Sequence, residues 1–127
     1  MRGLAFWFFI SAMLYGLGGV AFGLQMATAH DHSLAAVQGH LNGLGCLAMG
    51  LFGLYYNAVP QAGERLAARL HFLLSTIGLW LLIPGAIVAL NGGPAHLASA
   101  GLVVTGLATL LFAAIVVRHR RPVSLRA

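Results

Sequence analysis

The sequence predicts an all-α integral membrane protein: a four-transmembrane-helix bundle that forms a single domain over residues 1–127. Three observations lead to this fold class. Of the 127 residues, 60% are hydrophobic and only 7% are charged, whereas about a quarter of a soluble domain is charged. The mean hydropathy is +0.90. The few charged residues also separate long uncharged runs. A soluble enzyme and a nucleic-acid module are therefore excluded, although the formal net charge is +5.

Each helix is expected where an uncharged run is long enough to cross a hydrocarbon core of about 30 Å. None of the runs shows the period-two alternation of a barrel strand, so all must satisfy their backbone groups as helices. The four expected helices cover residues 4–28, 33–59, 70–90 and 95–117.

The arginines predict the orientation of the bundle. All of them lie in the gaps 1–3, 60–69 and 118–127, and none lies in the gaps 29–32 and 91–94. Arginine-rich short loops stay in the cytoplasm. We therefore expect a multi-pass protein of the bacterial inner membrane with both termini cytoplasmic. Ala27-Thr28-Ala29 resembles a signal cleavage site, but the preceding run is longer than a signal peptide needs, so the first helix is expected to remain.

Small residues are expected to control helix packing. Gly19 and Gly23, and likewise Gly39 and Gly43, form small-xxx-small pairs that let helices approach closely. Either pair fits packing within the chain or an interface between copies. Pro84 is expected to kink the third helix.

Two further residue groups have structural interpretations. Cys46 is the single cysteine, which excludes a disulfide within the chain, and it is expected to be a packing residue. Aromatic side chains near the helix ends are interpreted as interfacial belts, namely Trp7, Tyr55, Tyr56 and Phe72.

Polar residues inside the expected spans are the functional candidates. His40 lies about 10 Å below the outer edge of the second helix, on a rise of about 1.5 Å per residue. Neutral imidazole at that depth needs a hydrogen-bond partner or a metal, and histidine is a common haem ligand. Gln38 is two residues earlier and faces the opposite side of the helix. His71 is expected at the inner interface, about 15 Å from His40 in height, so the two cannot ligate one iron.

A second group of candidate ligands is expected at the outer surface. His-x-His beside a methionine suits copper, and histidine with aspartate suits zinc. The residues concerned are Met26, His30, Asp31, His32 and His96. The alternative to a metal site is that these are ordinary solvated loop residues.

The second helix resembles the tenth helix of haem-copper oxidase catalytic subunits, closest to the cbb-type oxidases and nitric oxide reductases. The segment Gln38-Gly-His40-Leu-Asn-Gly-Leu-Gly45 continues to Gly53-Leu-Tyr55-Tyr56-Asn-Ala-Val-Pro60, and the family spacing is kept at His40, Gly45, Gly53, Tyr56 and Pro60. The run Arg69-Leu-His71-Phe72-Leu-Leu is similar to the opening of the family's next helix. The match covers residues 29–90.

The resemblance implies a haem, but it does not imply an oxidase. The family's low-spin haem ligand falls on His40. Gln38 stands where the family has the ligand of the high-spin haem, and His71 is carried over as a further cofactor-binding candidate. The helices that hold the family's copper ligands have no counterpart, so oxygen or nitric oxide reduction by this chain alone is not expected.

The resemblance also bears on assembly. The family subunit has three pseudo-repeats of four helices, and this chain resembles one repeat, so a homotrimer is favoured over a dimer. Strict threefold symmetry would bring His40 of one copy toward the Gln38 face of the next, and a twofold dimer would let two His40 side chains face each other.

Three functional hypotheses follow. The first is a b-type haem protein with His40 as axial ligand, for electron transfer, gas binding or haem handling. The second is a haem-free accessory protein of a respiratory complex. The third is a copper- or zinc-handling protein that uses His30, His32 and His96.

Overall fold

The computed structural model describes residues 1–120 as an all-helical chain. Residues 121–127, which include part of the expected cytoplasmic tail, lie outside the described residues. The elements are α1 (Gly3–Ala29), α2 (Ala35–His40), the π-helix η1 (Leu41–Ala48), α3 (Met49–Ala58), α4 (Pro60–Gly63), α5 (Leu66–Leu90) and α6 (His96–Arg118).

Three of these helices are long and apolar enough to cross a membrane. They are α1, α5 and α6, with mean hydropathies of 1.8, 2.2 and 2.5 over their most apolar windows. Their bounds agree with the expected helices 4–28, 70–90 and 95–117 to within a few residues. α5 continues through Pro84 to Leu90. The chain therefore has the helices of a multi-pass membrane protein.

The second expected helix, 33–59, is divided into α2, η1 and α3. The backbone angles at His40, Leu41, Ala48 and Met49 are all right-handed helical, so the three elements follow one another without a turn between them. A uniform α-helix was the wrong expectation for the middle of this segment. In η1 the hydrogen bonds run from i to i+5, which widens the helix and changes which side chains share a face.

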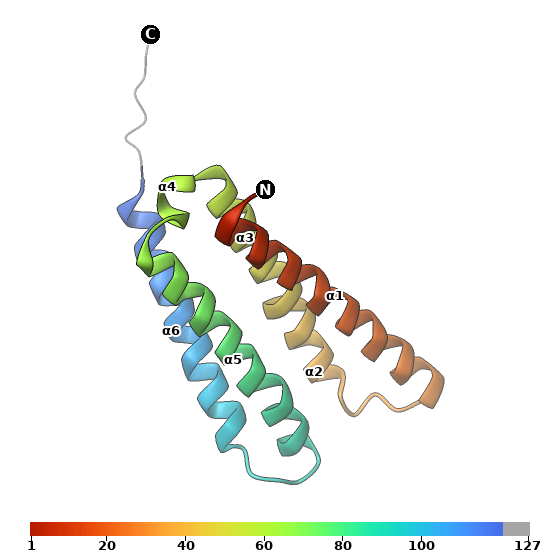
Figure 1. Cartoon of the computed structure of the whole chain (residues 1–127). Coiled ribbons are helices and arrows are strands. Elements are labelled where there is room, and N and C mark those ends of the chain that lie inside the picture. The colour runs from red at the N-terminus through yellow and green to blue at the C-terminus, as the bar shows by residue number, and fades with distance from the viewer. Residues whose placement is uncertain (121–127) are drawn as a thin grey trace.

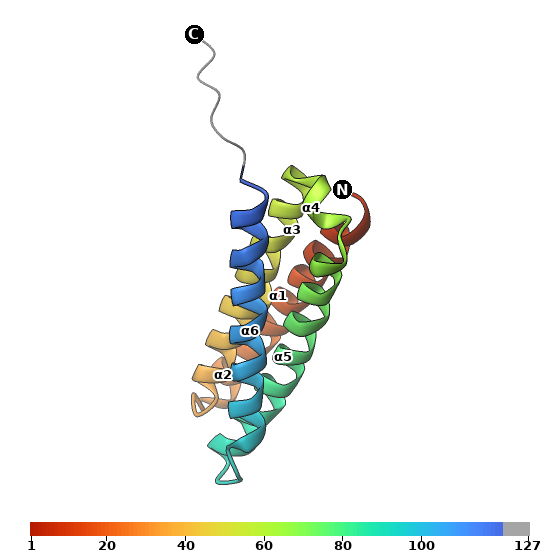
Figure 2. The ribbon, with the colours of Figure 1, turned by 90° about the vertical axis from the view of Figure 1, so that its left-hand side faces the viewer.

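The helices form two antiparallel hairpins (Figure 1). α1 pairs with the α2–η1–α3 segment, and α5 pairs with α6. Figure 2, turned by 90°, shows α6 lying along α5 over its whole length. The start of α1, the short helix α4 and the end of α6 lie at one end of the bundle, and the two short loops lie at the other. The arginines among the described residues thus share one end, as the sequence predicted.

Glycines allow α5 and α6 to pack closely. A Cβ atom at Gly85 would lie 2.5 Å from the backbone nitrogen of Ala98, and one at Gly78 would lie 2.5 Å from Thr105 Oγ1. On α6, a Cβ atom at Gly101 would overlap the backbone of α5. These positions tolerate no larger residue without separating the two helices, because backbone atoms cannot rotate away.

The two hairpins meet in an aromatic cluster near the end that carries α4. Phe8 of α1 is fully buried at its centre. Its ring lies 5.4 Å from Tyr56 and 4.9 Å from Phe72, measured between centroids. Phe112 of α6 closes the cluster against Phe52 at 4.5 Å. Tyr56 is thus part of the core, which corrects its expected place in an interfacial belt.

Candidate functional site

His40 ends α2 with its side chain exposed on the outside of the chain. Its Nδ1 lies 2.8 Å from the carbonyl oxygen of Ala36, one turn earlier. Because a carbonyl oxygen only accepts, Nδ1 carries the proton and donates this bond. Nε2 therefore keeps a free lone pair. A histidine whose Nδ1 is fixed in this way has the tautomer and orientation typical of a metal ligand.

Gln38 faces the other way, into the hairpin. Its Nε2 donates a hydrogen bond of 3.1 Å to the carbonyl oxygen of Gly19 on α1. A Cβ atom at Gly23 would lie 2.6 Å from the same amide nitrogen, and one at Gly19 would overlap the side-chain amide of Asn42. Gly19 and Gly23 thus serve packing within the chain. The opposite placement of Gln38 and His40 is as the helical spacing predicted, and it gives Gln38 a partner within its own hairpin.

The other glycine pair lies beside His40 and is open. A Cβ atom at Gly39 or at Gly43 would meet no other atom within 4 Å. Further along the same segment, Leu47 is 73% exposed and Leu51 is 60% exposed. His40 thus belongs to an apolar, small-residue stretch that nothing in residues 1–120 covers.

A groove of about 560 Å³ runs between α1 and η1. Its wall includes Leu17 and Val20 of α1 and Leu47 of η1, and it is almost entirely apolar. Cys46 lies in the same wall as a half-buried free thiol. Its Sγ would lie 3.0 Å from a Cβ atom at Gly16, in keeping with its expected packing role.

Among the candidate ligands, His71 has the surroundings that differ most from those the sequence predicts. It is 0% exposed, so its side chain points into the core of the bundle and not outward. The ring of Phe112 stacks on the imidazole at 5.1 Å, Phe8 lies at 5.1 Å and Phe52 contacts it edge-on at 4.5 Å. Closed in by these rings, His71 has no open side at which a haem iron could bind. The sequence could not show this, because the rings come from α1, α3 and α6.

His71 forms a hydrogen-bonded pair with Tyr56. The hydroxyl of Tyr56 lies 2.9 Å from His71 Nδ1, and both residues are buried. The second ring nitrogen, Nε2, has no hydrogen-bond partner within the described chain. Three hydroxyls are also buried without a hydrogen-bond partner in the described chain, those of Ser75, Thr76 and Thr105.

One signal in the sequence indicates that the polar side chains of His71 and Ser75 on α5 are buried. The buried residues of α5 recur at alternating intervals of three and four, which marks one helix face. They include Ala68, His71, Ser75, Gly78, Leu82 and Gly85. His71 and Ser75 share the face of the packing glycines, so this spacing could have shown that both point inward.

The outer histidines do not assemble into a site. Within residues 1–120, no three His, Cys, Asp or Glu side chains are placed to share a metal ion. His30 ends α1 in a left-handed conformation with a φ of 52°, and His32 and His96 are exposed. Asp31 instead accepts a hydrogen bond of 3.0 Å from the backbone N–H of Ser33. That bond, with a smaller effect from His32, holds the pKa of the Asp31 carboxyl below its usual value.

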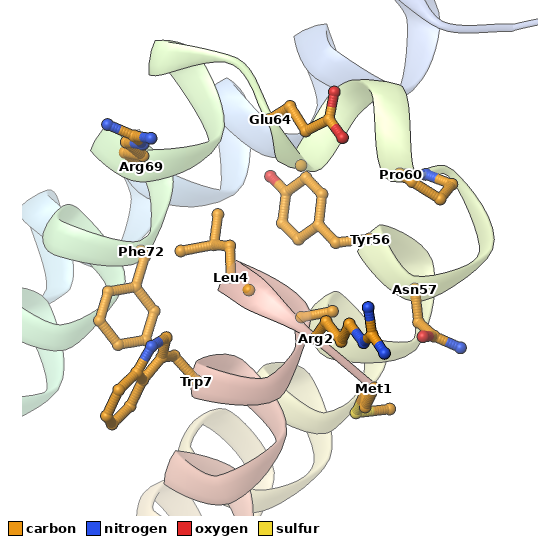
Figure 3. Close-up of a pocket in the computed structure, with 13 residues that line it drawn as sticks. Met1, Arg2, Leu4, Trp7, Tyr56, Asn57, Pro60, Glu64, Arg69 and Phe72 are labelled. Carbon is orange, nitrogen blue, oxygen red and sulfur yellow. The ribbon is translucent and has the colours of Figure 1, made fainter.

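A cavity of about 830 Å³ opens at the end of the bundle that carries α4 (Figure 3). Tyr56 lines it from α3, and Trp7 and Phe72 lie side by side on one wall. Arg2 and Arg69 lie on different sides of it. The hydroxyl of Tyr56 thus connects this cavity to the buried His71.

Comparison of the chain with known protein families, with curated proteins and with solved structures finds no match.

Proposed function

We propose that this chain is a membrane protein that binds a b-type haem with His40 as axial ligand, for electron transfer, gas binding or haem handling. The observation that carries the proposal is the Nδ1 hydrogen bond to Ala36, because it leaves Nε2 of an exposed imidazole free in an apolar surrounding. Bound haem would supply a redox-active iron, and the protein would supply the axial ligand and a dry apolar surface.

The surroundings of His40 fit a flat apolar ligand. Gly39 and Gly43 leave space on either side of it, since a Cβ atom at either position would contact nothing. The π-helix begins directly after His40, and such distortions of a helix are frequent at functional sites. Leu47 lies in the wall of the apolar groove seven residues further on. The resemblance of this segment to the haem-ligating helix of haem-copper oxidases supports the same assignment.

The proposal includes a fourth membrane span made by α2, η1 and α3. Their continuous helical backbone from Ala35 to Ala58 is long enough to cross a bilayer, at about 1.5 Å per residue in its α-helical parts. The shared end of the arginine-bearing gaps then lies in the cytoplasm. His40 lies in the outer half of the inner membrane. A homotrimer remains the favoured assembly, and a neighbouring copy or a small ligand would then supply any further ligand to the haem.

Haem titration of the purified chain tests the assignment. The detergent-solubilised protein, prepared without added haem, is titrated with haemin and followed at the Soret band. The wild type is expected to saturate, and His40→Ala is expected to bind at least tenfold more weakly, because a lost iron–imidazole bond removes the specific contact. His96→Ala is the matched control, since it also removes an exposed histidine. Equal binding by wild type and His40→Ala would refute the proposal.

A further inference from the structure

A small cavity whose mostly apolar wall includes three hydroxyl-bearing residues lies where η1 and α3 meet the hairpin of α5 and α6. Its volume is about 20 Å³. Ser75 of α5 and Thr105 and Thr109 of α6 provide the polar atoms, and Met49, Phe52 and Ala108 are among the apolar residues around them. It is separate from the surface around His40, since no residue of α2 lines it.

Two of the three hydroxyls at this cavity lack partners. Ser75 Oγ and Thr105 Oγ1 are buried and form no hydrogen bond, and the Ser75 side chain is 4% exposed. In a membrane-embedded bundle no lipid group can satisfy them. Thr109 Oγ1 donates to the carbonyl oxygen of Thr105 at 2.9 Å, so its lone pairs remain available as acceptors.

We propose that this cavity binds one water molecule, which bridges Ser75 on α5 to Thr105 and Thr109 on α6. A cavity needs about 10–15 Å³ to hold a water, and a buried water makes about three hydrogen bonds. The volume of about 20 Å³ and the three hydroxyls meet both conditions. A larger ligand does not fit. An apolar gas of similar size would leave the hydroxyls unpaired, whereas water can donate to and accept from each of them.

The water site continues the polar line that begins at the large cavity. Tyr56 lines that cavity and bonds to His71, and Ser75 follows His71 by one helical turn on the same face of α5. Phe52 contacts the His71 ring and also lines the water site. Polar groups thus extend from the α4 end of the bundle into its middle, through a core that is otherwise apolar.

Radiolytic footprinting of the full chain in detergent with ¹⁸O-labelled water tests the proposal. Hydroxyl radicals formed from a bound water oxidise the side chains next to it. Met49 lines the cavity and is 1% exposed, whereas Met26 is 4% exposed and does not line it. Both are buried methionines, so their intrinsic reactivity is matched. Met49 is expected to incorporate ¹⁸O at least fivefold faster than Met26.

Two variants change the cavity in independent ways. The double variant Ser75→Ala, Thr105→Val removes the two unpaired hydroxyls and adds no group that would fill the cavity. Ala108→Val keeps the hydroxyls and fills the space. Each is expected to lower the Met49 rate to that of Met26. Equal Met49 and Met26 rates in the wild type, or a Met49 rate unchanged in the folded double variant, would overturn the proposal.

Discussion

Gly85→Ala tests the close packing of α5 against α6. The new Cβ atom would lie 2.5 Å from the nitrogen of Ala98 and 2.8 Å from the carbonyl carbon of Leu97. Ordinary contacts of a Cβ atom lie at 3.4–4 Å, so the two helices must separate by about 1 Å. Overpacking of this kind costs about 1–3 kcal/mol. Alanine has a higher helix propensity than glycine, which offsets up to about 1 kcal/mol of this cost. The expected net loss is therefore about 1 kcal/mol.

The matched control is Gly106→Ala in the same hairpin. A Cβ atom there would meet nothing within 4 Å, so only the propensity term remains and stability is expected to stay the same or rise slightly. Both variants are unfolded in mixed micelles of a mild detergent and dodecyl sulfate, with helicity followed by circular dichroism. If Gly85→Ala unfolds at the same sulfate fraction as Gly106→Ala, the close approach of the two helices at this point is refuted.

Three further predictions concern the core, the open face and the topology. Tyr56→Phe leaves His71 Nδ1 without its partner and is expected to destabilise the fold by about 1–3 kcal/mol; no change in the same unfolding assay would refute the pairing. Gly43→Leu is expected to leave the unfolding transition unchanged while weakening haem binding, whereas Gly19→Leu is expected to disrupt the fold by displacing α2 and η1 from α1. In intact cells, Asp31→Cys is expected to react with a membrane-impermeant maleimide from outside, and labelling only after cell lysis would contradict the predicted orientation.

The positions of the helices could be predicted because hydropathy and charge act over long stretches of chain. The bounds of α1, α5 and α6 follow from where uncharged runs begin and end. The π-helix could not be predicted in this way. Leu41–Ala48 is about as apolar as the α-helical turns that follow it, so hydropathy does not distinguish the π-helical stretch from the α-helix beside it.

The candidate site was predictable only in part. The opposite directions of Gln38 and His40 follow from helical geometry alone. Gly19 packs against its own hairpin, whereas Gly43 stays open. This difference could not be predicted without knowing where the partner helix lies. His71 was assigned to the interface from its distance to Arg69 along the chain. Depth along a helix does not report direction around it, and direction determined its burial.

The axial role of His40 is the central claim, and a visible spectrum tests it most directly. The chain is expressed with adequate haem supply, purified in mild detergent and measured in the oxidised, reduced and carbon-monoxide-treated states. The wild type is expected to show a Soret band that shifts on reduction, and the band is expected to be absent from His40→Ala. A colourless wild type, or a band that persists unchanged in His40→Ala, would contradict the account.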